Sequence, residues 1–138
     1  MNAAEKAQGL EIATKIAAIV NLFKSEFPDA KANLKPWQND AQTYNFVDPD
    51  SIDLAFHLPG WSRRCQSHSM VVQIRFYRDP DENLQKLIGI ETAGINYSGE
   101  AWRLSTIDRW QFVGANLPTD EVKDKLKNFS RQVFKLFP

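Results

Sequence analysis

The sequence is poor in the residues on which metal and thiol chemistry depend. Its 138 residues include one cysteine, Cys65, and two histidines, His57 and His68. A lone cysteine excludes an intramolecular disulfide and favours a reducing compartment, so we expect a cytoplasmic protein. A structural zinc ion needs four ligands, mostly Cys and His, so a carboxylate such as Asp53 would have to complete the site. We therefore predict no metal and no cofactor.

An excess of charge and a long apolar run are also missing. The 17 basic and 17 acidic side chains give a formal net charge of zero, which disfavours nucleic-acid binding through neutralised phosphates. Residues 12–23 are apolar but are interrupted by Lys15 and are shorter than the roughly 20 residues that cross a bilayer. No signal-peptide pattern is present. We expect no membrane insertion.

Glycine is scarce, and no glycine-rich phosphate loop is present. Gly89, Gly94 and Gly99 lie in predicted β structure, and no helix follows them to offer its N-terminus to a phosphate. Nucleotide hydrolysis and dinucleotide-dependent oxidation are therefore poor interpretations.

The sequence does contain a repeated alternation of apolar and polar residues. It is clearest over residues 51–58 and 69–78, and a period of two gives each strand one apolar and one polar face. Further candidate strands, separated by turn residues, are 43–47, 84–95, 101–106 and 109–113. The short connections favour an antiparallel meander.

Two amphipathic helices are predicted to flank these strands. Residues 3–27 carry an apolar stripe at helical spacing, and Pro28 ends the helix because the residue before proline is pushed out of helical geometry. A second helix begins at Thr119, whose side chain can cap free amides, and continues almost to the C-terminus. We predict one α+β domain, residues 1–138, built as a two-layer sandwich. Both helices would pack on one face of a meander of four to six strands.

The other face of the sheet is then open to a partner. Pairing Arg78 with Leu84 across the turn places Ile74 opposite Ile88 on the core side. The open face would then carry mixed polar, charged and aromatic side chains, among them Asp53, His57, Gln73, Arg75, Tyr77 and Glu91.

Trp102 has two alternative positions on the fifth strand. An even-length turn before this strand would place Trp102 on the open face, where it would belong to a ligand or dimer surface. A one-residue bulge at Gly99 would instead send it into the core, the usual place of a large aromatic side chain.

The segment from residue 59 to 68 is predicted to be a ten-residue loop that mixes a tryptophan with arginines. Trp61, Arg63 and Arg64 would form a binding site in this loop, together with the open face. The alternative is that the Trp61 ring folds back and caps one end of the core.

A catalytic interpretation centres on His57, Cys65 and His68. Either histidine could activate Cys65 as a nucleophile, and Arg63 and Arg64 would favour the thiolate by lowering the thiol pKa. No nucleophile motif surrounds Cys65, so a small side chain that fills a gap is the simpler interpretation.

We conclude from the sequence that the chain is a non-enzymatic binding domain. It would engage a protein partner or a small ligand and form a homodimer, using Trp61, Arg63, Arg64, Gln73, Arg75, Tyr77 and Trp102. A small enzyme and a single-strand nucleic-acid binder, with aromatic platforms among arginines, are the alternatives. Fold alone would not choose among them.

Overall fold

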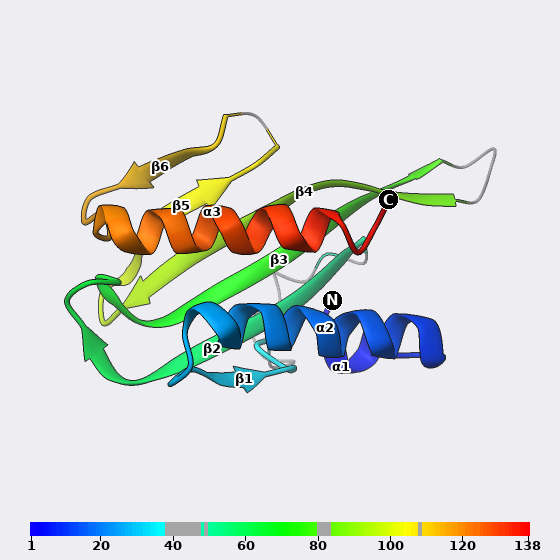
Figure 1. Ribbon diagram of the computed structural model, residues 1–138, viewed down its shortest axis with the longest axis horizontal. Helices are drawn as coiled ribbons and strands as arrows, with labels where there is room; N and C mark the ends of the chain where they lie inside the picture. Colours follow the sequence, from blue (N-terminus) through cyan, green and yellow to red (C-terminus); the bar gives the residue numbers. More distant parts are fainter. Residues whose placement is uncertain (38–47, 49, 80–83, 108) are drawn as a thin grey trace.

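One antiparallel sheet and its flanking helices make up the described part of the chain (Figure 1). The computed structural model describes all residues except 38–47, 49, 80–83 and 108. The strands are β1 (Lys31–Asn33), β2 (Ser51–Ser62), β3 (Ser67–Asp79), β4 (Leu84–Asn96), β5 (Gly99–Ser105) and β6 (Gln111–Gly114), and the helices are α1 (Ala3–Lys6), α2 (Leu10–Glu26) and α3 (Asp120–Phe134). The strands follow one another across the sheet in chain order, as a meander.

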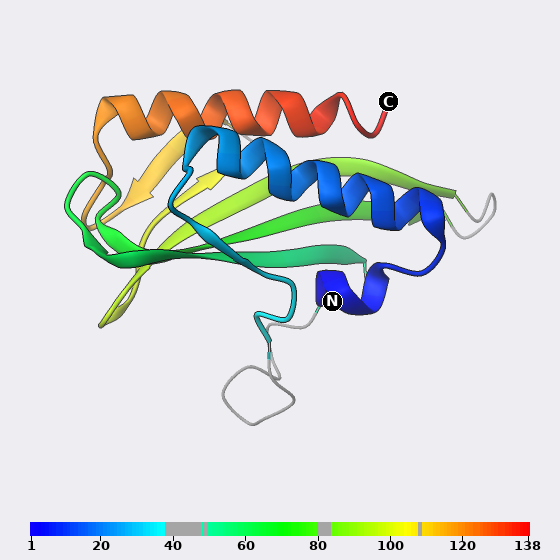
Figure 2. The ribbon, with the colours of Figure 1, turned by 60° about the horizontal axis from the view of Figure 1, so that its bottom comes forward.

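The two long helices, α2 and α3, lie on the same face of the sheet (Figure 2). They run in opposite directions, and their apolar stripes meet at Phe23 and Phe129, whose rings are 5.1 Å apart and packed edge to face. A side-chain hydrogen bond of 2.6 Å from Asn128 to Glu26 also joins them. The predicted α+β arrangement, with both terminal helices on one face, is confirmed.

The predicted first helix is divided in two. Gly9 adopts a φ of +89°, a left-handed conformation that glycine tolerates and that interrupts helical geometry. The chain therefore forms the short α1, turns at Gly9 and begins α2 at Leu10. The second helix begins as predicted: the Thr119 hydroxyl accepts a hydrogen bond from the Val122 amide at the start of α3.

The predicted loop over residues 59–68 is wrong, because most of it is strand. β2 continues to Ser62 and β3 begins at Ser67, so only a four-residue tip remains. The regular pairing stops at His57 and resumes at Ser62, which pairs with Ser67. This irregularity accommodates Pro59, whose missing N–H cannot join a regular ladder.

The edge next to β2 also differs from the prediction. The expected strand over residues 43–47 lies outside the described residues, and β1 was not predicted. Three residues of β1 pair with β2, from Lys31 opposite His57 to Asn33 opposite Ala55. A strand this short carries too little alternation to be recognised from sequence.

The register of β3 and β4 corrects the predicted one. Ile74 pairs with Ile90, not with Ile88. Leu84 pairs with Asp79 instead of Arg78, which shifts the register by one residue, and a bulge at Ile88 adds the second. Leu87 therefore turns inward and contacts the core opposite Phe76. Ile88 turns outward instead and is 48% exposed.

Trp102 is fully buried, which removes it from any binding surface. Gly94 of β4 pairs with Trp102, and the next residue of β4, Ile95, pairs with Glu100. Ala101 therefore has no paired residue on β4, and this bulge turns Trp102 inward. The predicted bulge thus exists, two residues beyond Gly99. The indole packs directly on Gly94, where an added Cβ would collide with the ring. Gly94 therefore provides the space for Trp102.

Candidate functional site

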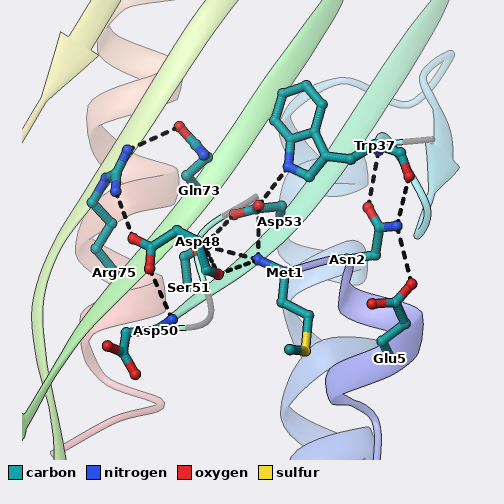
Figure 3. A network of polar contacts seen from close by, with 10 residues as sticks. All are labelled: Met1, Asn2, Glu5, Trp37, Asp48, Asp50, Ser51, Asp53, Gln73 and Arg75. Atoms are coloured by element: carbon teal, nitrogen blue, oxygen red, sulfur yellow. Dashed lines mark hydrogen bonds and ion pairs between the residues drawn. The ribbon is translucent and has the colours of Figure 1, made fainter. Parts of the chain in front are cut away.

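The sheet face that points away from α2 and α3, here called the outer face, is not bare. Asp53, Ala55, Gln73 and Ala93 point to this side, yet each is less than 10% exposed. The N-terminal residues and the segment after β1 cover part of it, as the polar contacts in Figure 3 show. The expectation of an uncovered face is therefore corrected.

Between this cover and the sheet lies a pocket of about 400 Å³, here called the outer-face pocket. β2, β3, β4 and β5 supply its floor, and the segment after β1 supplies a wall. It is lined by Asn33, Pro36, Trp37, Ala55, His57, Ser69, Val71, Gln73, Ala93, Ile95, Gly99, Glu100 and Arg103. Its size is in the range of small-molecule sites, and a mostly apolar lining with a few polar groups is typical of them.

The wall of the pocket is held in place by Trp37. Its indole N–H donates to Asp53 Oδ2 at 2.5 Å, and its backbone N–H and carbonyl bond the Asn2 side chain at 2.9 and 2.8 Å. Asp53 is completely buried and also accepts the Ser51 hydroxyl at 2.8 Å and the Met1 ammonium group at 3.0 Å (Figure 3). The buried carboxylate is thus satisfied and anchors the wall to β2.

A chain of side-chain hydrogen bonds crosses the rim of the pocket. Asn33 Oδ1 accepts the Lys35 backbone N–H at 2.9 Å, so the Asn33 amide nitrogen faces His57 Nε2 at 3.2 Å. His57 Nε2 must then be the acceptor, and Nδ1–H donates to Ser69 Oγ at 2.8 Å. The Ser69 hydroxyl has one hydrogen to donate, and His68 Nδ1 lies 3.1 Å away. The network assigns one tautomer to His57.

A row of charges borders the pocket across β3, β4 and β5. Arg75 contacts Asp48 at 2.9 Å and Glu91 at 2.6 Å, and Arg103 contacts Glu91 and Glu100, each at 2.7 Å. Burial alone would lower the pKa of Arg103, but hydrogen bonds and charges from Glu100 and Glu91 outweigh it and raise the pKa. Arg103 is therefore a fixed and compensated cation.

Cys65 does not join this site. It is 5% exposed, packs in the hydrophobic core and contacts neither His57 nor His68 in any hydrogen bond among the described residues. Burial raises the pKa of the Cys65 thiol, and the charges of Lys125 and Arg64 only partly oppose this. Arg64 acts in the predicted direction and lowers the thiol pKa, but burial outweighs it, so the geometry provides no activated thiol.

The aromatic and basic residues of the β2–β3 hairpin lie apart from the outer-face pocket. Trp61 is 47% exposed, and its ring centre is 6.5 Å from that of Tyr97. A second pocket of about 380 Å³ is lined by Trp61, Arg64 and Cys65, together with residues from the ends of α2 and α3. Arg64 lies 3.9 Å from Glu121 of α3. Arg63 is exposed at the tip.

The structure thus separates the predicted site residues into groups. His57 and Gln73 line the outer-face pocket, with Arg75 beside them, whereas Trp61 and Arg64 line the second pocket. Tyr77 is 55% exposed on the outer side of β3 and lines neither.

Sequence analysis missed the pocket residues outside the strongest strands, namely Asn33, Pro36, Trp37, Glu100 and Arg103. A tryptophan after a proline in a polar segment, Pro36-Trp37, is the one local signal that was available. Within the described ranges, no three His, Cys, Asp or Glu side chains gather closely enough to hold a metal ion. In the same residues, no helix has the length and apolar character needed to cross a membrane.

Fold and site together define a small α+β domain with a pocket on the face of its sheet opposite the helices. The chain matches a family described as a domain of unknown function over residues 4–138, and it belongs to that family. Searches of curated proteins and of solved structures found no match.

Proposed function

We propose that the domain binds a small molecule in the outer-face pocket. The observation that carries this proposal is a pocket of about 400 Å³ that combines apolar walls with a few fixed polar groups. Ala55 and Ala93 form the floor with small side chains, so the space above them is not filled by the sheet itself.

The fixed wall favours a small molecule over a protein partner as the occupant. Trp37 is anchored to both Asp53 and Asn2, so the pocket exists before binding and little ordering would oppose association. A protein surface would need a flat or open face, and the cover over Asp53 obstructs one.

Fluorescence of the neutral probe N-phenyl-1-naphthylamine tests this proposal. The probe should become brighter with the wild-type protein and stay dim with Val71→Trp, which fills the pocket. Leu10→Trp at the start of α2 is the matched control, because Leu10 is 83% exposed and does not line the pocket. Circular dichroism would establish that both variants are folded.

Amide chemical shifts of the wild-type protein give a second readout that needs no variant. Probe-induced shifts should gather on Val71, Ala93 and Ile95. Shifts that gather at the second pocket, or an equal response from both tryptophan variants, would refute the proposal.

Self-association is a second proposal, which rests on β6. This strand ends the sheet, its four residues carry no charge, and Val113 is largely exposed. Uncharged edge strands are prone to pair with another chain. Light scattering should show a dimer for the wild type and a monomer for Val113→Lys, and a monomeric wild type at all concentrations would exclude it.

A further inference from the structure

Gln73 is a buried polar side chain on the floor of the outer-face pocket. The residue is 7% exposed, and it stands opposite Asp53 of β2 and Glu91 of β4 in the middle of the sheet. Buried amide groups are normally hydrogen-bonded, because a lost bond to water must be replaced.

Only one half of the Gln73 amide has such a bond. Its Oε1 accepts from Arg75 Nη2 at 3.3 Å, which fixes the orientation of the amide (Figure 3). The Nε2 group lies on the side of the amide away from Arg75 (Figure 3), and Gln73 lines the pocket. Among the residues that the structure describes, Nε2 has no hydrogen-bond partner.

The groups around this amide argue against a charged ligand. Three carboxylates, those of Asp48, Glu91 and Glu100, face the two guanidinium groups of Arg75 and Arg103. Among the described residues that border the pocket, both guanidinium groups are already paired with carboxylates, and an anion would also lose its hydration on entering. Four of the side chains that line the pocket, Ala55, Val71, Ala93 and Ile95, are apolar.

Resting on the proposed function, we infer that the ligand of the outer-face pocket is an uncharged, mainly apolar ring compound with a carbonyl oxygen. The carbonyl oxygen accepts a hydrogen bond from Gln73 Nε2, and the ring packs on the alanines of the floor and beside Trp37. The Gln73 amide is then satisfied at both ends, which accounts for a polar residue in this position.

Three probes of similar size test the inference: 1-tetralone, tetralin and 1-naphthoate. They are a neutral ketone, its parent hydrocarbon and an anion. Titrations followed by amide and side-chain NH₂ resonances should give the tightest binding for 1-tetralone, with a shift of the Gln73 side-chain signal. One neutral hydrogen bond corresponds to roughly three- to tenfold in affinity over tetralin.

The variant Gln73→Met keeps the length of the side chain and removes its donor. It should bind 1-tetralone no more tightly than it binds tetralin. Gln8→Met is the matched control, because Gln8 is exposed and does not line the pocket, and it should leave both affinities as in the wild type.

The outcomes separate the inference from the proposed function. Equal binding of 1-tetralone and tetralin, without an effect of Gln73→Met, overturns the carbonyl assignment and leaves the small-molecule pocket standing. Tightest binding of 1-naphthoate overturns the assignment as well, in favour of an anion. If no probe shifts the pocket residues, the proposed function itself fails.

Discussion

The indole N–H of Trp102 donates a hydrogen bond of 2.7 Å to the backbone carbonyl oxygen of Cys65, thirty-seven residues away in the chain. Both residues are buried, so this bond ties β5 to the tip of the β2–β3 hairpin within the core. The contact satisfies a buried carbonyl group in the turn of the hairpin, beyond the last β2–β3 pair.

Replacing Trp102 should therefore destabilise the fold in two graded steps. Trp102→Phe keeps most of the ring but leaves the Cys65 carbonyl unpaired, at a cost of about 1–3 kcal/mol in the free energy of unfolding. Trp102→Ala also opens a cavity and should cost about 3–5 kcal/mol. Urea denaturation measures both, and Trp61→Phe at the half-exposed position should change the value by less than about 0.5 kcal/mol.

The Cys65 thiol should react slowly with thiol reagents in the native protein. Because burial raises its pKa, the thiolate fraction near neutral pH falls below that of a free cysteine, whose pKa is about 8.5. The rate of reaction with a thiol reagent should be much lower in buffer than in concentrated urea. A native titration midpoint at or below 8.5 would contradict this prediction.

The same raised pKa makes stability depend on pH in the alkaline range. Above the pKa of the unfolded thiol, the unfolded chain loses the proton that the native thiol retains, so the unfolding free energy falls as pH rises. We expect this decline to begin near pH 8.5, about the free-cysteine value. Cys65→Ala should lack this component of the decline, and identical pH profiles for the two proteins would show that the thiol contributes nothing.

The buried carboxylate of Asp53 should be among the most sensitive positions of the outer face. Asp53→Ala removes the buried carboxylate that accepts from the Trp37 indole N–H, the Ser51 hydroxyl and the Met1 ammonium group, at a cost of at least about 2 kcal/mol. Asp50→Ala is the control. Its ion pair with Arg78 is 3.8 Å long and exposed, so its loss should cost less than about 1 kcal/mol. Equal losses in the two variants would mean that the Asp53 contacts do not support the wall.

The tautomer of His57 can be read directly from nitrogen chemical shifts. The Asn33 amide nitrogen faces Nε2, so the neutral ring should carry its proton on Nδ1. Long-range ¹H–¹⁵N spectra distinguish the two tautomers. The preference should disappear in Asn33→Ala, which removes the donor that faces Nε2, and a wild-type ring protonated on Nε2 would require a different orientation of Asn33.

The layers of the fold followed from periodicity, whereas the register depended on bulges. Apolar spacing and the cap at Thr119 were enough to place α2 and α3 on one face of a meander. The bulge that exchanges the positions of Leu87 and Ile88 was not predictable, because both residues are apolar and either one satisfies the core. The inward position of Trp102 also depends on a bulge, the one at Ala101.

The candidate site was predictable only where it lies on long strands. Alternation placed His57 and Gln73 on the outer side of β2 and β3, which is where they stand. Trp37 could not be assigned, since its position depends on contacts with Asn2 and Asp53, which are distant in sequence and carry no local pattern. A wall formed by such long-range contacts has no periodic signature.

That wall has an evolutionary consequence. Pro36 and Trp37 belong to a connection between strands, while the floor beneath them belongs to the sheet. Connections tolerate substitution and changes of length far better than paired strands do. On the proposed function, changes in this connection alone should alter the choice of ligand, while the scaffold that packs around Phe23 and Trp102 stays the same.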